Sequence, residues 1–451
     1  MQQNFCFGQT ELERFSIDLE FYYDTNESIY DENSDVTSYE TFSSAVSSSD
    51  SFEDTIDDKN EVALEVYSNS NSNLLVTFDD DDEFKEDQLD LSKEKNIVKH
   101  ILSNLKFGMD LESIPLPAFI LESRSVLEML ADLYSYSDLF VQIPDGQTEY
   151  ERFKRVVKWY LSTFRARLVP KKPYNPIIGE VFQCIYEIGN SDENFERKIT
   201  PNRPISWANS NDLSFVAEQV SHHPPISAFY LEHSNRGIQL NGFAKSVSKF
   251  YGLSVGVESI GNSVISLLKY DEEYVFTYPA SFVRSILTVP WLEIVGKVTI
   301  SCQKSGYSAQ INFLPKPFYG GKKHQIEATV FSPDKNIVNK LYGDWTETIY
   351  IQTDSSIETF LESSSLRKHK KKVRKIIDQE ENESRKVWQE VTHHLRNKQC
   401  DLANKAKIQV EQKQREEAIC RKNKNIEWTS KYFHLSDNQW NFNEPLKKRI
   451  V

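Results

Sequence analysis

Two adjacent histidines followed by two prolines form the most distinctive stretch of the chain, AEQVSHHPPISAFY at residues 217–230. Pro224 favours an extended conformation at His223 and so narrows the directions that its imidazole can take. Near neutral pH, imidazoles donate hydrogen bonds to phosphate and gain charge beside it. We therefore expect His222 and His223 to bind a phosphate group, with a purely structural role as the alternative.

A second candidate segment, VPKKPYNPIIGEVFQC at residues 169–184, carries two prolines that fix the backbone. Pro173 and Pro176 disfavour helix at the residues before them, so the segment is a stiff, extended or turning piece. It presents an ammonium group at Lys172 and an amide at Asn175. Both groups suit a phosphate, although an ordinary loop would have the same composition.

A third candidate is KIQVEQKQR, where Lys407, Glu411 and Arg415 are spaced four residues apart. In a helix this spacing puts all three side chains on one face. They would form either a surface ladder of ion pairs or a lysine and an arginine directed at a phosphate and oriented by Glu411. The three segments together would bind a phosphomonoester tightly if they converge, and the sequence does not establish that they do.

Metal and catalytic chemistry have little support in the sequence. No Cys, His or acidic residue near the histidine pair has the spacing of a zinc site, so we expect neither a metal nor a cofactor. The five cysteines are scattered without a CxxC pair, which favours a reducing compartment. An enzyme using His222 or His223 as a general base is the weakest alternative, because no nucleophile is paired with them.

The elements that would position these groups divide into helices and strands by their hydrophobic period. Helical spacing predicts helices over KNIVKHILSNL, SVLEMLADLYSYSDLF, ERFKRVVKWYLSTFRA, ESRKVWQEVTHHLRNK and ANKAKIQVEQKQREEAICRKNK. Alternation predicts strands over GIQLNGFAKSVS, NSVISLLKY, GKVTISCQKSGYSAQINFLP and WTETIYIQ. Successive strands without intervening helices favour an antiparallel sheet that is closed or nearly closed.

Charge is distributed unevenly along the chain. Residues 1–92 carry 25 acidic and 3 basic side chains, whereas the remaining residues carry 42 acidic and 50 basic ones. The acidic, serine-rich first part has the composition of a disordered tail. The mildly basic body suits a negatively charged partner such as a phosphate or a membrane surface.

Several features bear on membranes. The first residues lack the basic and apolar regions of a signal peptide, and no window approaches the length of an apolar span. The basic run RKHKKKVRK at residues 367–375 is most simply a solvated surface, with attraction to anionic lipid headgroups as the alternative.

In the acidic tail, DLEFYYDTNE at residues 18–27 resembles the FFAT motif, two phenylalanines in an acidic tract. That motif binds receptors displayed on the endoplasmic reticulum. The stretch departs from it in Phe21, in the two tyrosines Tyr22 and Tyr23, and in Thr25. A neutral acidic tail is the alternative, because short motifs match by chance.

The body of the chain resembles the oxysterol-binding protein family. EQVSHHPPISAF is similar to the family signature, and KKPYNPIIGE and KxxxExxQR follow the family pattern in the expected order. DLESIPLPAFILESRSVLEML resembles the family's lid and following helix, and SKFYG, GYSAQINF, GDW and EWTSKYFHL also occur in order. The resemblance covers about residues 95–436. The C-terminal QWNFNEPLKKRIV departs from the usual ending.

This resemblance implies a fold, mainly β with α: a nearly complete antiparallel β-barrel around a lipid tunnel, with an N-terminal lid and helices and a C-terminal helical segment. It divides the chain into a disordered acidic tail (1–92), a lipid-binding domain (93–440) and a C-terminal tail (441–451). By position it implies headgroup contacts from Lys172, Asn175, His222, His223, Lys407, Glu411, Arg415 and Ser248. The lid would cover acyl chains with Leu116, Ile120 and Leu121.

The resemblance further implies a lipid-transfer protein and not an enzyme. LPAFILESRS and KKPYNP look closest to the branch that exchanges phosphatidylserine for phosphatidylinositol 4-phosphate, although Ala118 and Ser123 depart from it. A sterol exchanger and a lipid-regulated scaffold are the alternatives. We expect membrane lipids as ligands, transient contact with anionic membranes, an endoplasmic reticulum FFAT receptor and no nucleic acid. The expected location is cytoplasmic, peripheral at contact sites between the endoplasmic reticulum and the plasma membrane.

Overall fold

An antiparallel sheet of 15 strands makes up most of the described chain. The computed structural model describes residues 75–77, 106–111, 121–166, 171–188, 204–286, 288–317 and 319–449. All of them fall within the compact unit Asn71–Val451. The lid residues Leu116 and Ile120, the FFAT-like stretch and the helix predicted over KNIVKHILSNL lie outside the described residues.

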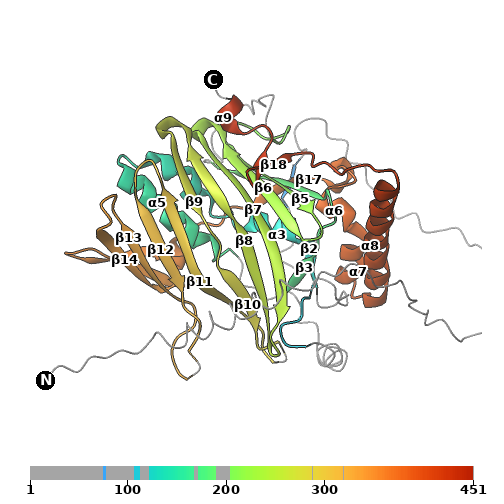
Figure 1. Cartoon of the computed structure of the whole chain (residues 1–451), viewed down its shortest axis with the longest axis horizontal. Helices are drawn as coiled ribbons and strands as arrows, with labels where there is room; N and C mark the ends of the chain where they lie inside the picture. Colours follow the sequence, from blue (N-terminus) through green and yellow to red (C-terminus); the bar gives the residue numbers. More distant parts are fainter. Residues whose placement is uncertain are drawn as a thin grey trace, which may run out of the picture. The chain divides into compact units, whose positions relative to one another are not determined.

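The strand order follows the sequence almost without crossover, as expected for successive hairpins (Figure 1). The order is β1, β17, β4, β5, β6, β7, β8, β10, β11, β12, β13, β14, β15 and β16, while β9 pairs with both β8 and β11. Among the described residues, β1 and β16 end this order and do not pair with each other, so the sheet is not fully closed, in agreement with the predicted nearly complete barrel. Its strands are β1 (Leu75–Thr77), β17 (Lys371–Arg374), β4 (Val181–Glu187), β5 (Asp212–Ser221), β6 (Ile226–His233), β7 (Ile238–Phe250), β8 (Ser254–Leu267), β9 (Glu272–Phe276), β10 (Ala280–Arg284), β11 (Trp291–Cys302), β12 (Ser308–Phe313), β13 (Gln325–Phe331), β14 (Ile337–Asp344), β15 (Thr348–Gln352) and β16 (Ile357–Glu362).

Alternation of burial along the strands shows which face lines the core. β9 and β15 alternate buried and exposed residues, because one face meets the core and the other meets solvent. β5 is instead buried along nearly its whole length. Its Phe215 belongs to the main core and its Val216 to a second cluster on the outer face. The four strand regions predicted from alternation all lie in this sheet.

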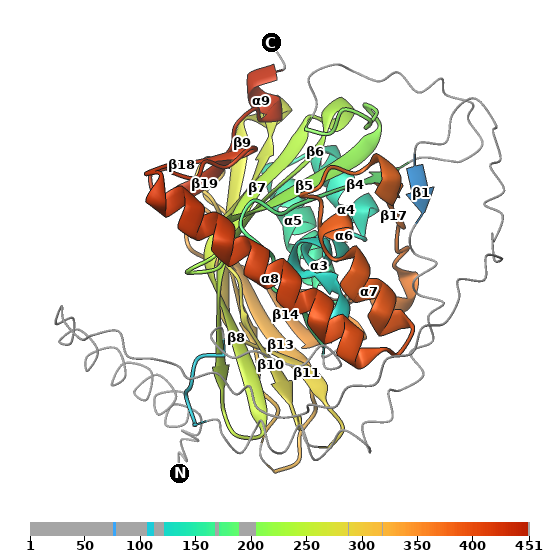
Figure 2. The same cartoon turned by 90° about the vertical axis from the view of Figure 1, so that its right-hand side faces the viewer.

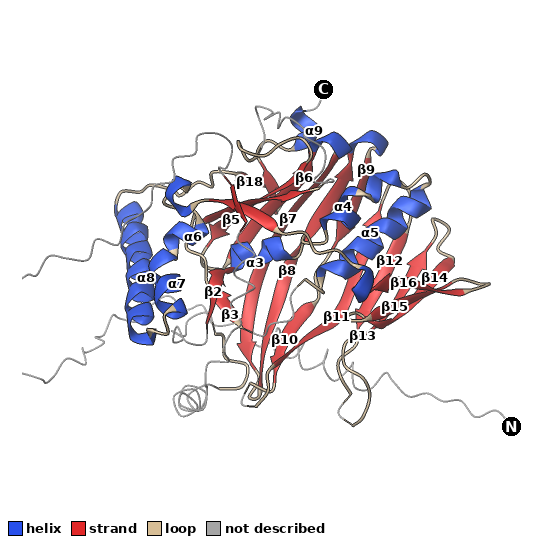
Figure 3. Cartoon of the chain, turned by 180° about the vertical axis from the view of Figure 1, so that it is seen from behind, coloured by secondary structure: helices blue, strands red, loops and turns tan. Residues whose placement is uncertain are grey.

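Three helices pack on the inner face of the sheet (Figure 3): α3 (Val126–Asp132), α4 (Ser137–Val141) and α5 (Glu149–Thr163). Thr148 and Glu151 form a capping box that begins α5, which confirms the predicted helix. The single helix predicted over SVLEMLADLYSYSDLF is wrong, because the chain leaves the helical path between α3 and α4. There the Ser135 carbonyl accepts a hydrogen bond of 2.7 Å from the His369 backbone, a long-range partner that replaces a helical one.

Three further helices lie at the end of the sheet formed by β4 and β5, away from β13 and β14 (Figures 1 and 2): α6 (Ser384–Val387), α7 (Gln389–Arg396) and α8 (Cys400–Asn423). The predicted helix over ESRKVWQEVTHHLRNK is broken at Trp388, whose ring stacks on Tyr174 at 4.7 Å. Helix α8 confirms the last predicted helix. Among the described residues, no helix has the length and apolarity required to cross a bilayer.

Two segments predicted to be tails pack on the sheet instead. Residues 75–77 form β1, which pairs with β17, although the composition of residues 1–92 predicts disorder. Near the other end, β18 (Phe433–Ser436) pairs with β19 (Gln439–Phe442), and α9 (Leu446–Arg449) follows. Phe442 stacks on Tyr230 of β6 with ring centroids 4.2 Å apart, and Leu446 is 1% exposed. Residues 441–449 therefore complete the outer core and are not a free tail.

A buried ion cluster joins β17 to α3. Lys371 Nζ lies 2.6 Å from Asp132 and 3.2 Å from Glu128, and Arg385 also pairs with Glu128 at 2.5 Å. Burial alone would raise the pKa of Glu128, but Arg385 and Lys371 hold it well below its usual range. Within the basic run, Lys372 pairs with Glu187 and Arg374 with Glu383.

The solvated-surface interpretation of the basic run is therefore wrong for its centre. Lys371 is 3% exposed and lies in a strand of the sheet. Only its flanking residues Arg367, Lys368, Lys370 and Lys375 are exposed. The acids that pair with the centre lie far away in sequence, so composition alone could not reveal them.

Replacing Lys371 with Met tests this cluster. Two buried carboxylates then lose a shared partner, so we expect the free energy of unfolding to fall by about 3 kcal/mol, as for other broken buried pairs. The exposed neighbour Lys370→Met is the matched control and should change it by less than about 0.5 kcal/mol. Urea unfolding of the three proteins measures both effects. Equal midpoints would contradict the structural role of Lys371.

Candidate headgroup site

The Pro-Tyr-Asn-Pro segment lies beside the carboxyl end of β5. β3 (Lys172–Tyr174) pairs in parallel with β2 (Leu121–Ser125), and the chain then turns through residues 175–180. The Gly179 backbone donates to the Gln219 carbonyl, and the Gln219 backbone donates to the Glu180 carbonyl, both at 2.9 Å. Gly179 has φ +75, and a Cβ there would lie 3.4 Å from the Trp428 indole nitrogen. The turn therefore requires glycine.

The histidine pair forms the turn between β5 and β6. The ring centroids of His222 and His223 lie 4.6 Å apart, and His222 Nδ1 lies 3.1 Å from the Pro176 carbonyl. His222 is half-buried and His223 is exposed. Two predicted segments, the Pro-Tyr-Asn-Pro turn and the histidine turn, thus meet directly.

Helix α8 supplies the third predicted group. Lys407 Nζ pairs with Glu411 at 2.6 Å, and Gln414 on the same helix accepts a hydrogen bond of 3.3 Å from the Ile178 backbone. The electrostatic influence of Glu411 and Arg415 reaches the His222 ring. All three predicted segments therefore converge at one place.

The surroundings of His222 favour a neutral imidazole. Burial and the neighbouring His223 lower the pKa of His222, although the Pro176 carbonyl and Glu411 act in the opposite direction. A neutral ring can hold one proton on the nitrogen that faces a phosphate, and a bound dianion would then favour the charged form. His222 could thus gain a proton when an anion lies beside it.

The other predicted positions lie around this centre. Lys172 is half-buried in β3, and Asn175 is exposed between the buried Tyr174 and Pro176. Ser248 lies on β7, two residues beyond Ser246, whose backbone donates to the Pro225 carbonyl at 3.1 Å. The Ser248 carbonyl accepts a hydrogen bond of 3.0 Å from the Leu111 backbone. No described contact joins the Ser248 side chain to the histidines.

Leu121 occupies a different place from the one the lid assignment predicts. It lies in β2, is 6% exposed, and packs in a cluster with Tyr174, Trp388 and Val391. This cluster supports the base of the Pro-Tyr-Asn-Pro turn. Leu121 therefore has a structural contact in the described part of the chain.

Sequence reasoning did not single out Glu180, which holds the turn in place. Glu180 is 0% exposed and accepts hydrogen bonds from the Ser125 hydroxyl at 2.5 Å, the Trp388 indole at 2.9 Å and the Ile177 backbone at 3.1 Å. Burial raises the pKa of Glu180, because these donors offset desolvation only in part. The sequence did carry a signal, because Glu180 ends KKPYNPIIGE, one of the segments that resemble the family.

Glu218 was missed in the same way and holds the C-terminal segment. Its carboxylate accepts from the Ser430 hydroxyl at 2.7 Å and from the backbones of Lys431 and Tyr432 at 2.9 Å each. Glu218 lies three residues before Ser221, where the histidine turn begins. The strand that carries the histidines is therefore fixed on its outer side as well. Among the described residues, no cluster of three or more His, Cys, Asp or Glu could hold a metal.

Comparisons with known proteins identify one family. The family described as Oxysterol-binding protein matches residues 100–395. The chain is 46% identical over 387 residues to oxysterol-binding protein-related protein 9 of Homo sapiens, covering 84% of this chain and 52% of that protein. It is 42% identical over 397 residues to oxysterol-binding protein-related protein 10 of Homo sapiens, with the same coverage of 84% and 52%. The chain thus spans about half the length of these relatives.

Solved structures share the fold at lower identity. The Osh3 ORD of Saccharomyces cerevisiae in complex with PI(4)P superposes with a TM-score of 0.56 at 19% identity, over 78% of this chain and 91% of that one. The Osh1 ORD domain in complex with ergosterol gives 0.59 at 21% identity, over 77% and 86%.

Replacing Glu180 with Ala tests whether this carboxylate holds the site together. Three buried donors lose their acceptor, so we expect the free energy of unfolding to fall by at least about 2 kcal/mol and amide exchange to accelerate at residues 172–179. Glu187→Ala removes a partly exposed ion pair and serves as the control, with an expected loss below about 1 kcal/mol. Urea unfolding and hydrogen exchange measure the two effects. If amide exchange at residues 172–179 does not change, contacts other than those of Glu180 hold this turn in place.

Proposed function

The chain belongs to the oxysterol-binding protein family, and from this premise we propose that it extracts phosphatidylinositol 4-phosphate from membranes and exchanges it for phosphatidylserine. The observation that carries the proposal is the convergence of the histidine turn, the Pro-Tyr-Asn-Pro turn and helix α8. A phosphomonoester would be held by His222 and His223, with Lys172, Asn175, Lys407 and Arg415 around it. Glu411 would orient Lys407, with which it pairs at 2.6 Å.

A protein that extracts such a lipid must meet two opposite requirements, one for the acyl chains and one for the headgroup. A lipid in water exposes its acyl chains, and burial gains roughly 0.8 kcal/mol per methylene group. An unpaired phosphate away from water is costly, so the headgroup requires fixed cationic partners. An apolar barrel interior with a cationic rim meets both requirements, and no bond is broken during exchange. Residues 112–120, with Leu116 and Ile120, would cover the chains.

The second ligand is proposed as phosphatidylserine, with Ser248 near its headgroup. Sterol is the second candidate, because the Osh1 ORD domain of similar fold is in complex with ergosterol. Both candidates keep phosphatidylinositol 4-phosphate as the counter-ligand. They differ in one requirement: phosphatidylserine has a charged headgroup that needs polar partners in the barrel, whereas a sterol does not.

The proposed place of action is the cytoplasmic side of contacts between the endoplasmic reticulum and the plasma membrane. The FFAT-like stretch around Tyr22 and Tyr23 would bind a receptor on the endoplasmic reticulum. Exposed cations flanking β17, such as Lys368 and Lys370, are available for transient contact with anionic lipid.

The histidine pair provides the first test. His222→Ala combined with His223→Ala should reduce extraction of phosphatidylinositol 4-phosphate from vesicles by at least about tenfold, because one lost charge-assisted hydrogen bond contributes at least about 1.4 kcal/mol. The adjacent pair on α7 offers a matched control: His393→Ala with His394→Ala should extract normally. Sedimentation of vesicles with labelled lipid measures extraction, and circular dichroism verifies the fold. Normal extraction by the first variant would remove these histidines from the site.

The identity of the second ligand provides another test. Transfer of phosphatidylserine between vesicles should accelerate when the acceptor vesicles contain phosphatidylinositol 4-phosphate, because both lipids compete for one cavity. Fluorescent lipid sensors follow the transfer, and the same assay with a sterol is run in parallel. Acceleration of sterol and not of phosphatidylserine would establish the sterol alternative, and chemically altered lipid would indicate an enzyme.

A further inference from the structure

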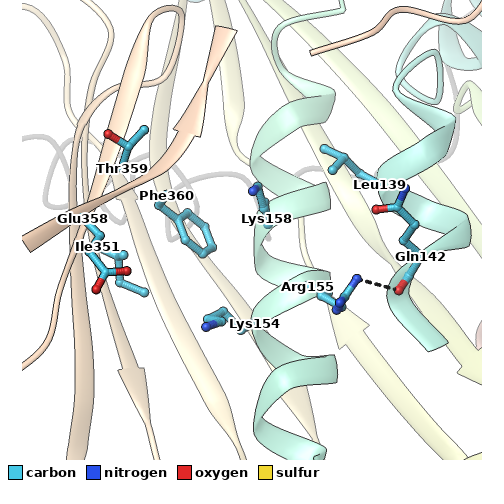
Figure 4. Close-up of a pocket in the computed structure, with 9 residues that line it drawn as sticks. All are labelled: Leu139, Gln142, Lys154, Arg155, Lys158, Ile351, Glu358, Thr359 and Phe360. Carbon is cyan, nitrogen blue, oxygen red and sulfur yellow. Dashed lines mark hydrogen bonds between the residues drawn. The ribbon is translucent and has the colours of Figure 1, made fainter. Parts of the chain in front are cut away.

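A cavity of about 330 Å³ lies between α5 and the edge of the sheet, far along the sheet from α8 (Figures 3 and 4). One wall comes from α4 and α5 and the other from β15 and β16. The lining residues are Leu139, Gln142, Lys154, Arg155, Lys158, Ile351, Glu358, Thr359 and Phe360. None of them belongs to the candidate headgroup site, so any role of this cavity is independent of the proposed function.

Three cations of α5 line this cavity. Lys154 and Lys158 are four residues apart and point toward β16, whereas Arg155 points toward α4, where it donates to the Gln142 carbonyl at 3.1 Å (Figure 4). Among the described residues, none of the three forms an ion pair. Burial lowers the pKa of Lys158, and the neighbouring Arg155 and Lys154 lower it further. The cations therefore repel one another around a shared space.

The opposite wall is shaped by a β-bulge in the edge strand. Ile349 pairs with Leu361 and Tyr350 with Thr359, which leaves Phe360 as the extra residue of β16. Phe360 is 7% exposed and lies across the cavity from Lys158, whose Nζ is 5.9 Å from the ring centroid. The bulge thus puts an apolar ring opposite the cations.

One acid partly offsets the positive charge. Glu358 is exposed at the rim and accepts a hydrogen bond of 3.0 Å from the Ser356 hydroxyl. Glu151 also influences Lys154 and Arg155, but its carboxylate is held by the backbones of Gln147 and Thr148 at the start of α5. The cavity lining itself retains an excess of two positive charges.

We propose that this cavity is a second anion-binding site, which takes a phosphorylated group. Its phosphate would lie between Lys154 and Lys158, with Arg155 adding positive charge from the α4 side, and its less polar part would contact Phe360. The volume suits a small ligand or a single headgroup. The same chemistry could come from a soluble phosphate compound or from a membrane lipid, and the experiment separates the two sources.

The test uses the full chain carrying His222→Ala and His223→Ala, so that the headgroup site does not contribute. Lys154→Glu with Lys158→Glu is compared with a matched control, Lys297→Glu with Lys340→Glu, which reverses two exposed strand lysines. In the soluble arm, calorimetry measures the binding of inorganic pyrophosphate. In the membrane arm, co-sedimentation measures binding to phosphatidylcholine vesicles that contain phosphatidylinositol 4-phosphate.

The α5 variant should bind at least about tenfold more weakly than its parent in one arm, while the control stays within about twofold. Glu358→Gln removes the rim acid and should strengthen binding in that same arm, a result that misfolding cannot produce. A loss confined to pyrophosphate indicates a soluble ligand, and a loss confined to vesicles indicates a lipid headgroup. Equal binding by parent, α5 variant and control in both arms, or no binding at all, would overturn the proposal.

Discussion

Glu180 is the group on which the candidate headgroup site depends. Its carboxylate joins β2, the turn after β3 and Trp388 between α6 and α7, and its backbone joins β5. These segments are far apart in sequence, and Glu180 joins them together with the β2–β3 pairing and the stack of Trp388 on Tyr174. Burying a carboxylate is costly, and the three donors make the arrangement tolerable only when all of them are present. The Pro-Tyr-Asn-Pro turn, which contacts His222 through the Pro176 carbonyl, is thereby held in position by Glu180.

The barrel and the site use opposite sides of the same strands. Inward residues such as Phe215 and Ile265 form one continuous apolar core, whereas outward residues of β5 and β6 meet the β18–β19 hairpin. Because side chains alternate along a strand, β5 can contribute to both clusters and still end in the histidine turn. One strand therefore contributes to the apolar interior and to the histidine turn, and a shift in its register would disturb both.

The sequence predicts the strands well and the helix breaks poorly, for a physical reason. Alternation reports burial on one face, and β12, β15 and the second half of β11 follow it, whereas β7 is half-buried along most of its length. The breaks between α3 and α4 and at Trp388 depend on distant partners, His369 and Tyr174, which no local pattern contains. The basic run was misjudged for the same reason. The site segments were identified by residue type, but the supporting role of Glu180 and Glu218 depends on partners more than 200 residues away in sequence, such as Trp388 and Ser430, which no local motif contains.

The hydrogen bonds of Glu218 impose an order on biosynthesis. Ser430, which binds this carboxylate, lies 212 residues further along the chain. β5 and its histidine turn therefore leave the ribosome long before Ser430, the hairpin after it, and helix α8 have been translated. During that interval the carboxylate of Glu218 lacks its partners at residues 430–432, and neither Glu411 nor Arg415 exists beside the imidazoles. A ribosome-bound chain thus carries the histidine turn before the side chains of helix α8 that lie near it in the folded protein have been made.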